Sequence, residues 1–259
     1  MPAPPLDTAF IKENLQTQFV GQNFLFFHNI PSTMDTAREE ALHKAPEGTA
    51  VFAERQTAGR GRMKREWLTP EGNVAVSIVL YPPPELFNQL IMLASVSVVN
   101  AIKQTTGIDC SIKWPNDILI DSKKVCGILI ETRVDKQGTG YAVLGIGINV
   151  ALQAAQHKEI NEIATSLEEK AGCPVSREKL LINLFSEIEK LYEQMKQGVS
   201  IYSLWKNKLG MLGKHVRVQS LGNILEGVAE SVAEDGSLIL RCADGELKRI
   251  TIGDVSLGS

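Results

Sequence analysis

Residues 56–67, with the sequence QTAGRGRMKREW, form the segment of this chain best suited to bind an anion. Two glycines and four cations fall within the seven residues from Gly59 to Arg65, directly after an expected strand. Glycines let the backbone approach a ligand closely, while consecutive N–H groups and guanidinium groups suit phosphate or carboxylate oxygens. A solvated hairpin tip is the usual alternative for a basic loop. Trp67 and the alternation of glycine with arginine favour a loop that wraps an anionic small molecule.

A fixed cation is expected in the motif KWPND, residues 113–117. Lys113 stands at a strand end beside Trp114, next to a proline that restricts the backbone. Asn116 and Asp117 follow as a polar pair that can hold a ligand or a Mg²⁺ ion. A strand–bulge–strand with an exposed lysine explains this motif equally well when it is taken alone.

Two later motifs place glycines within apolar strands: KKVCGILIE at residues 123–131 and LGIGINV at residues 144–150. Glycines in such positions mark bulges, or a ligand pressed against the backbone. Close strand packing is the better interpretation of either motif taken singly. Neither motif alone therefore establishes a ligand site.

Several other kinds of site are absent from the sequence. It contains no GxxxxGK[ST] phosphate loop, no HExxH zinc motif and no GxSxG nucleophile motif. The four histidines are widely scattered, which disfavours a histidine-based triad or metal site: His28, His43, His157 and His215. The four cysteines, at positions 110, 126, 173 and 242, form no CxxC pair. We expect small, buried thiols in a reducing compartment.

The composition indicates a globular protein rather than a nucleic-acid coat or a membrane protein. The 259 residues carry 27 Lys+Arg against 30 Asp+Glu, a net charge of -3, whereas nucleic-acid coats have a basic excess. The N-terminus lacks the pattern of a secretory signal, and the longest apolar runs, residues 90–102 and 141–152, are too short to span a bilayer. We therefore expect a soluble, cytoplasmic protein that binds neither membrane nor DNA.

Hydrophobic periodicity predicts an α+β domain over residues 1–212 and a small β-barrel over residues 213–259. The expected helices cover residues 7–18, 32–44, 86–104, 176–196 and 201–209. The expected strands of the larger domain cover residues 24–28, 49–55, 73–81, 111–114, 117–120, 125–134 and 141–150, the last two joined around residues 136–140. Short strands at 216–219, 225–232, 238–242 and 246–252 follow, with Asp-Gly turns at 235–236 and 244–245.

Taken together, the motifs resemble those of the biotin protein ligases. The resemblance rests on GRGR with a basic segment and Trp, then KWPND, KVCGILIE and GIGIN, in this order and spacing. It runs from about Phe24 to the C-terminus and includes Ser32 and Thr33, which are similar to the family's Ser-Thr-Asn opening. It implies a mixed central sheet with flanking helices, as in biotin and lipoate ligases, followed by a small SH3-like C-terminal β-barrel.

The same resemblance implies roles for individual residues. The implied biotin-binding residues are Ser32, Thr33, Met34, Gln56, Arg60, Gly61, Arg62, Lys113, Gly127 and Gly145. The implied ATP-binding residues are Arg60, Arg62, Arg65, Trp67, Lys113, Asn116 and Asn149. Lys113 and Arg62 would be catalytic. Mg²⁺ would enter with ATP, and no protein ligand for it is assigned beyond Asp117 as a candidate.

The implied reaction has two steps, with biotin and ATP as substrates. A carboxylate is a poor acyl donor, so biotin is first converted to biotinyl-5′-AMP with release of pyrophosphate. A lysine amine of a biotin carboxyl carrier protein domain, part of a biotin-dependent carboxylase, then attacks this mixed anhydride and releases AMP. Fixed cations are needed because two anions must approach each other. No covalent enzyme intermediate is needed.

Three other functions compete with this one. A lipoate–protein ligase would share the fold and the adenylate chemistry, but KWPND and GRGR favour biotin. A biotin-sensing repressor is disfavoured because only 31 residues precede Ser32, without a second strong helix or a basic recognition stretch, so we expect a form without a helix-turn-helix domain. A non-catalytic binding module would lack Lys113 or the arginines. The resemblance also allows a homodimer through the central sheet.

Two residues depart from the family pattern. Met34 stands where the family usually has Asn, so a polar contact is lost there. Lys64 replaces the third glycine of the loop, and a non-glycine residue tolerates a positive φ poorly, so we expect the loop to follow a slightly different path.

Overall fold

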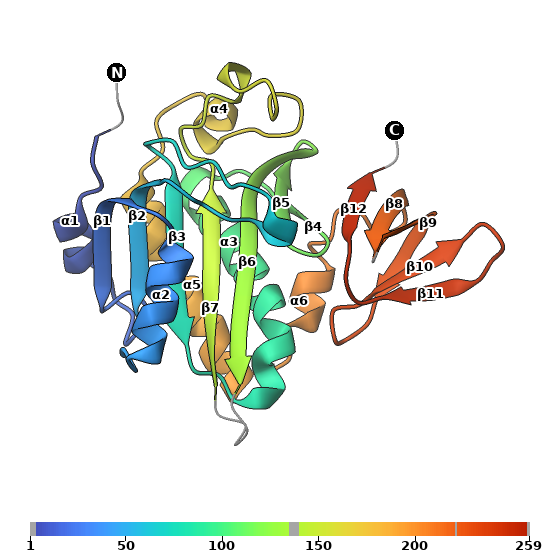
Figure 1. Ribbon diagram of the computed structural model, residues 1–259, viewed down its shortest axis with the longest axis horizontal. Helices are drawn as coiled ribbons and strands as arrows, with labels where there is room; N and C mark the ends of the chain where they lie inside the picture. Colours follow the sequence, from blue (N-terminus) through green and yellow to red (C-terminus); the bar gives the residue numbers. More distant parts are fainter. Residues whose placement is uncertain (1–3, 135–139, 221, 258–259) are drawn as a thin grey trace.

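The protein folds into a larger part built on a seven-stranded sheet and a smaller C-terminal part built on a five-stranded sheet, which lie side by side (Figure 1). The computed structural model describes residues 4–134, 140–220 and 222–257. The larger part contains helices on both faces of its sheet, whereas the described C-terminal part is all β. The predicted α+β class is confirmed.

The larger sheet has the strand order β1-β2-β3-β7-β6-β5-β4. Its first pair, β1 with β2, is parallel, and the remaining neighbours are antiparallel, so the sheet is mixed as predicted. The strands are β1 Phe24–Ile30, β2 Ala50–Gln56, β3 Val74–Leu80, β4 Ser111–Lys113, β5 Asp117–Ile120, β6 Lys123–Val134 and β7 Gly140–Ile148. The expected turn at residues 136–140 lies almost wholly outside the described residues.

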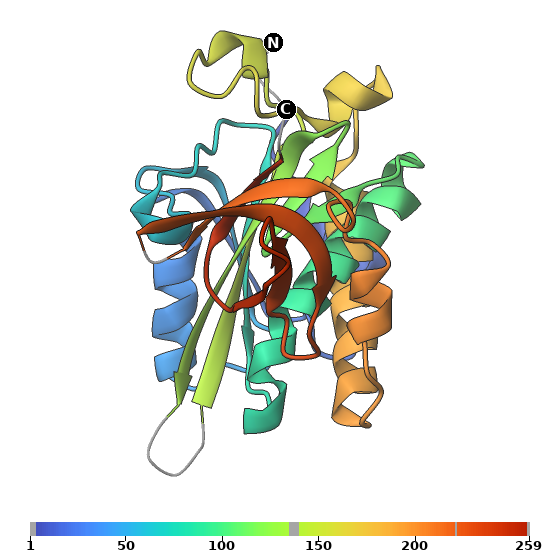
Figure 2. The same cartoon turned by 90° about the vertical axis from the view of Figure 1, so that its right-hand side faces the viewer.

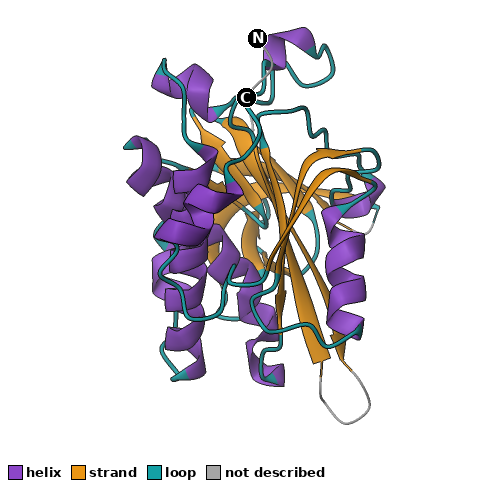
Figure 3. Ribbon diagram, turned by 90° about the vertical axis from the view of Figure 1, so that its left-hand side faces the viewer, coloured by secondary structure: helices purple, strands orange, loops and turns teal. Residues whose placement is uncertain are grey.

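The middle of this sheet is covered on both faces. Every residue of β3 is buried, as is every residue of β7 after Gly140, because helices pack against each side. Helix α2, Thr33–Leu42, covers one face, while α3, Leu90–Thr106, and α5, Arg177–Lys196, cover the other (Figure 3). Strands buried on both faces read as continuous apolar runs.

Helix α3 is the core helix of the larger part. With the preceding 3₁₀ turn it spans Pro84–Thr106, long and apolar enough to cross a membrane, yet 67% of its most apolar window is buried inside the structure. The prediction that this run is too short to span a bilayer is therefore wrong on length. The helix ends at Gly107, whose φ of 76° provides the left-handed cap that glycine adopts without strain. It packs against the sheet and against α5, whose N-cap is Ser176.

The C-terminal part is an antiparallel sheet of five strands in the order β11-β10-β9-β8-β12. Its strands curl strongly, as seen end-on in Figure 2. The strands are β8 His215–Ser220, β9 Asn223–Val232, β10 Leu238–Cys242, β11 Leu247–Ile250 and β12 Asp254–Leu257. Hydrogen bonds tie it to the larger part; among them, Trp114 Nε1 donates to the Gly236 carbonyl over 2.8 Å, and the Tyr202 hydroxyl donates to the Val232 carbonyl over 2.5 Å.

The sequence-based prediction missed or misjudged several short elements. It missed β12 and α4, Leu167–Ala171, because four or five residues are too few to show a periodicity. Helix α1 is limited to Thr8–Asn14 and α6 to Tyr202–Lys206, both shorter than expected.

The cysteine prediction holds for only part of the set. Cys126 is fully buried, whereas Cys173 is exposed, so the expectation of four buried thiols is wrong there. Cys110 and Cys242 are partly exposed. Burial raises the pKa of Cys110 to about 12, which keeps that thiol protonated and unreactive at neutral pH.

Candidate active site

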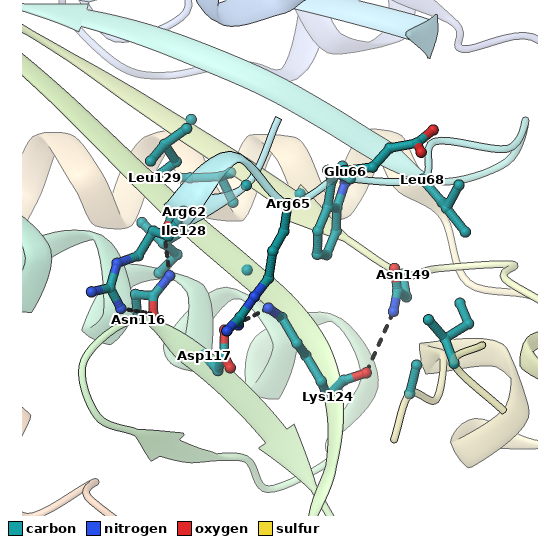
Figure 4. Close-up of a pocket in the computed structure, with 18 of the residues that line it drawn as sticks. Arg62, Arg65, Glu66, Leu68, Asn116, Asp117, Lys124, Ile128, Leu129 and Asn149 are labelled. Atoms are coloured by element: carbon teal, nitrogen blue, oxygen red, sulfur yellow. Dashed lines mark hydrogen bonds and ion pairs between the residues drawn. The ribbon is translucent and has the colours of Figure 1, made fainter. Parts of the chain in front are cut away.

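A cavity of about 870 Å³ lies against β6 and β7, between the basic loop, the loop after β7 and the edge of the C-terminal sheet. Nearly all predicted site residues line it, although they come from segments far apart in the chain. The predicted residues that line it are Thr33, Met34, Gln56, Arg60, Gly61, Arg62, Arg65, Trp67, Lys113, Asn116, Asp117, Gly127, Gly145 and Asn149. Figure 4 shows part of this cavity, with Arg65, Asp117 and Lys124 converging.

Ser32 is the predicted residue that does not line the cavity. It is the N-cap of α2, and its side chain is only 1% exposed. Its hydroxyl finds no hydrogen-bond partner among the described residues. A buried hydroxyl without a hydrogen-bond partner costs free energy, so this group suits a hydrogen bond to a ligand atom or a water molecule.

One end of the cavity joins a small polar network to an apolar wall. The Gln56 side-chain oxygen accepts hydrogen bonds from the Thr33 backbone N–H at 2.8 Å and from the Thr33 hydroxyl at 3.1 Å. The Ser77 hydroxyl in turn donates to the Thr33 hydroxyl over 2.8 Å. Beside this network, the Met34 thioether lies directly over Gly145, so a Cβ at Gly145 would collide with it. This end therefore suits a ligand with an apolar body and a few polar atoms.

Trp67 lies flat against strand backbone, which glycines make possible. A Cβ at Gly147 would overlap the indole ring, and one at Gly127 would lie 2.9 Å from it. The Lys124 ammonium lies 5.3 Å from the indole centroid on the cavity side, a cation–π contact. The absence of side chains at these glycines of β6 and β7 therefore leaves the room that the Trp67 ring occupies.

Lys113 and Lys124 share a single carboxylate at the centre of the cavity. Lys113 Nζ lies 3.1 Å from Asp117 Oδ2, and Lys124 Nζ lies 2.6 Å from Asp117 Oδ1. Burial raises the pKa of Asp117, but the ammonium groups of Lys124 and Lys113 outweigh it and hold that pKa below its usual value. Two cations facing one anion leave a net positive charge, which favours binding of a further anion.

Arg62 and Arg65 point toward the C-terminal sheet. Arg62 Nη1 donates to Asn116 Oδ1 at 3.0 Å and to Asp254 Oδ1 at 2.9 Å. Arg65 Nη2 lies 2.8 Å from the other oxygen of Asp254. Within this loop Met63 adopts a positive φ of 54°.

Arg60 separates from the other two arginines. Its two terminal nitrogens donate to Asp35 of α2 at 3.0 and 2.7 Å, and one also lies 3.7 Å from Glu131 of β6. The sequence-based prediction grouped all three arginines on the phosphates. The structure instead divides them between two sets of carboxylates, a division that depends on tertiary neighbours invisible in the motif.

The loop after β7 closes the remaining side of the cavity. Asn149 Nδ2 donates to the Thr165 carbonyl at 3.1 Å and to the Lys124 carbonyl at 3.4 Å, the second of which appears in Figure 4. These bonds hold the loop against β6. Its apolar side chains, with Leu68 opposite, complete the cavity wall: Leu152, Ile160, Ile163 and Ala164.

The sequence analysis missed several lining residues. Lys124 belongs to a quoted motif, but the pattern does not show which of the neighbouring lysines faces the cavity. Gly147 is the second glycine of GIGIN, and the motif likewise does not show that it lines the cavity. Asp254 and Lys214, from the C-terminal part, carried no local signal.

Comparison with known proteins places this cavity in a family. The biotin/lipoate A/B protein ligase family model matches residues 26–149, and the biotin protein ligase C-terminal domain model matches residues 211–258. The bifunctional ligase/repressor BirA of Bacillus subtilis (strain 168) is 39% identical over 259 residues, which cover 98% of this chain and 79% of that protein. The chain belongs to the biotin protein ligase family.

Solved biotin protein ligases share the fold. The ligase from Aquifex aeolicus in complex with biotin and ATP has a TM-score of 0.79 at 30% identity, covering 92% of this chain and 99% of that one. The ligase from Leishmania major in complex with biotinyl-5-AMP has a TM-score of 0.61 at 26% identity, covering 89% and 99%. The family resemblance seen in the sequence motifs is therefore confirmed, as is the fold.

Proposed function

We infer that this protein is a biotin–[acetyl-CoA-carboxylase] ligase, which activates biotin with ATP to biotinyl-5′-AMP and transfers biotin to a carrier protein. The observation that carries this conclusion is a single cavity that joins an apolar, glycine-floored end to a cluster of fixed cations. Lys113, the last residue of β4, lines this cavity and pairs with Asp117. This is where a carboxylate and a phosphate would have to meet.

We propose that Lys113 and Lys124 bring the two anions together in the first step. A biotin carboxylate oxygen attacks the α-phosphorus of ATP, a new P–O bond forms, and the bond to pyrophosphate breaks. The shared Asp117 fixes both ammonium groups before the substrates arrive, so little reorganisation is needed during the reaction. Such preorganised cations stabilise the charge that develops on the transferring oxygens.

The polar network at the apolar end provides sites for the head group of biotin. Thr33 and Gln56 offer hydroxyl and amide groups there, and the unpartnered Ser32 hydroxyl lies one residue away, deeper in the protein. Met34 supplies an apolar contact where the family pattern has an amide, and Gly145 leaves room beneath it. We propose that this end binds the fused rings, with the acid chain directed toward Lys113.

The opposite end provides sites for the nucleotide. Arg62 and Arg65 lie beside Asn116, in reach of a triphosphate, whereas Arg60 is occupied by Asp35 and Glu131. We propose that Arg60 acts by anchoring the loop and that Trp67, Asn149 and the apolar loop after β7 surround the purine. This assignment changes the role predicted for Arg60 from phosphate contact to loop anchor.

Asp117 and Asp254, two of the carboxylates that line this cavity, are already engaged by cations. Asp117 gives both oxygens to lysines and Asp254 gives both to arginines. Among the residues that the structure describes, no group of three or more His, Cys, Asp or Glu side chains is arranged to hold a metal ion. We propose that any Mg²⁺ arrives bound to the phosphates of ATP rather than to Asp117.

The second step needs access for a lysine of the acceptor protein. Its neutral amine nitrogen bonds to the biotin carbonyl carbon, the bond to the AMP oxygen breaks, and the nitrogen releases a proton to solvent. AMP leaves with its negative charge near Lys113. We propose that the acceptor is a biotin carboxyl carrier protein domain. A cytoplasmic location and a homodimer through the larger sheet remain predictions of the sequence analysis.

Pyrophosphate release from ATP and Mg²⁺ by the purified protein tests the proposal, with biotin and lipoate compared side by side. Biotin-dependent release, followed by labelling of a biotin carboxyl carrier domain, is expected. Release with lipoate alone would keep the adenylation chemistry and overturn the substrate. A folded protein that binds biotin and releases no pyrophosphate would contradict the proposed ligase activity.

A further inference from the structure

Asp254 connects the C-terminal sheet to the basic loop. It is the first residue of β12, and its two carboxylate oxygens are divided between two arginines that lie nearly 200 residues earlier in the chain. Oδ1 lies 2.9 Å from Arg62 Nη1, and Oδ2 lies 2.8 Å from Arg65 Nη2. The Asp254 side chain is 21% exposed and lines the same cavity as Lys113.

Arg62 is held from three directions at once. Besides Asp254, it donates to Asn116 Oδ1 at 3.0 Å and to the Gly253 carbonyl at 3.1 Å. Asn116 is itself fixed, because its Nδ2 donates to the Ile128 carbonyl at 2.7 Å. The guanidinium group therefore bridges the larger sheet and the C-terminal sheet.

The strand that carries Asp254 is a firm support. β12 pairs with β8 in antiparallel register from Asp254 opposite Gln219 to Leu257 opposite Val216. Val216, Val218 and Val255 are buried in the core that the two parts share. A carboxylate placed at the start of such a strand cannot follow the loop if the loop moves.

We propose that Asp254 is a positioning residue for adenylation: it presents Arg62 and Arg65 to the phosphates of ATP from the C-terminal sheet. This inference rests on the proposed function. Arg62 has a side chain that is 23% exposed, and its three partners leave one orientation for its remaining N–H groups. A long side chain fixed before the ligand arrives loses less conformational entropy when it binds.

A purely electrostatic view predicts the opposite effect. Asp254 adds a negative charge beside the expected phosphate site, so its neutralisation would raise the positive potential and tighten ATP binding. A positioning role predicts weaker binding, because both arginines lose their common anchor. The sign of the change in ATP affinity therefore distinguishes the two roles.

Asp254→Asn tests the proposal in the full-length protein, with Asp244→Asn as a matched control. Asp244 is an exposed residue of the same sheet whose side chain accepts a hydrogen bond from the Glu246 backbone N–H, outside the cavity. We expect the KM for ATP in biotin-dependent pyrophosphate release to rise about 10- to 100-fold in Asp254→Asn, since misplaced groups cost that much. Biotin affinity, measured by titration without ATP, is expected to stay within about twofold of wild type.

A double-mutant cycle then shows whether Asp254 acts through the arginines. Asp254→Asn in an Arg62→Ala, Arg65→Ala background is expected to have little further effect on the KM for ATP. Full additivity, an unchanged KM, or a lower KM for ATP in the single variant would overturn the proposal. Thermal unfolding of every variant shows whether the fold is kept. Asp254→Glu retains a carboxylate, so we expect it to restore the KM for ATP in part, at an unchanged Tm. Absence of biotin-dependent release in the wild type would refute the proposed function instead.

Discussion

The floor and the roof of the cavity are built in different ways. The floor is the backbone of β6 and β7, two central strands of the larger sheet, opened by Gly127, Gly145 and Gly147. The roof is the loop over residues 57–68, whose arginines are held by side chains from three other elements: Asp35 on α2, Glu131 on β6 and Asp254 on β12.

This difference assigns the two surfaces different tasks. A backbone floor within a paired sheet cannot adjust, so it selects a ligand by shape. A roof held by part-exposed ion pairs can open and close over a ligand, since such pairs contribute only about 0–1 kcal/mol each. We expect floor variants to change which ligand fits and roof variants to change how long it stays.

Lys113→Ala should have the largest effect, because Lys113 is one of the two cations that Asp117 fixes in the cavity. Loss of one preorganised charge in such a site costs about 10²–10³-fold in rate, so adenylate formation should fall by that factor. Pyrophosphate release is the measurement, and thermal unfolding establishes that the fold is kept. Lys103→Ala, which removes an exposed lysine paired with Asp109, serves as the control. Wild-type adenylation by a folded Lys113→Ala protein would contradict the assignment.

Gly145→Val tests the floor. The new side chain would meet the Met34 thioether, and overpacking of this kind costs about 1–3 kcal/mol, equivalent to roughly 5- to 150-fold in affinity. The KM for biotin should rise within that range, with a smaller change in the KM for ATP. Gly61→Ala changes a glycine of the roof loop, where an added Cβ would meet nothing closer than 3.5 Å, and so compares the roof with the floor. An equal rise in the KM for biotin and the KM for ATP would contradict the proposed difference between floor and roof.

Arg62→Ala tests the roof. It removes three charge-assisted hydrogen bonds, one to Asn116 and two to the adjacent residues Gly253 and Asp254, and so weakens closure of the loop over the intermediate. We expect biotinyl-5′-AMP to dissociate about 10-fold faster or more, since hydrogen bonds to charged groups contribute about 1.5–3 kcal/mol. Release of labelled adenylate after rapid dilution measures this rate. A slowly released intermediate would show that other contacts hold it.

Asp117→Asn should have the smallest effect. It should change the free energy of unfolding slightly at neutral pH, and the change should depend on pH in a characteristic way. Because Lys124 and Lys113 together hold the pKa of Asp117 below its usual value, its ion pairs stabilise the protein above about pH 3.9 and this contribution disappears as the pH falls through the lowered pKa. Above about pH 5 the Asp117 carboxyl is ionised in both the folded and the unfolded protein, since its ordinary pKa is about 3.9. The difference in the free energy of unfolding between wild type and variant should therefore stay constant from about pH 5 to about pH 8. The difference should shrink in stronger acid. A difference that grows below about pH 4 would contradict this assignment.

Much of the fold and of the site could be predicted from local sequence. Strands β3 and β7 and helix α5 follow from apolar patterns long enough to show their period, and the motifs around Lys113 and Gly127 identified the family. Short elements escaped, because α4 and β12 offer too few residues for a pattern. Asp254 escaped for the same reason, although it holds two of the three roof arginines, Arg62 and Arg65.

The sequence by itself determined the chemistry available: the cations, the glycines that clear the floor, and the order of the motifs. Only the tertiary structure decided which partner each charge takes. Glu54 and Arg177, 123 residues apart, form a buried pair at 2.5 Å, and Arg60 is separated from Arg62 by carboxylates on different elements. Periodicity reports how a residue faces its own helix or strand. The partner of a long charged side chain depends on which distant segments of the chain lie next to it in space, and a local sequence pattern carries no information about that.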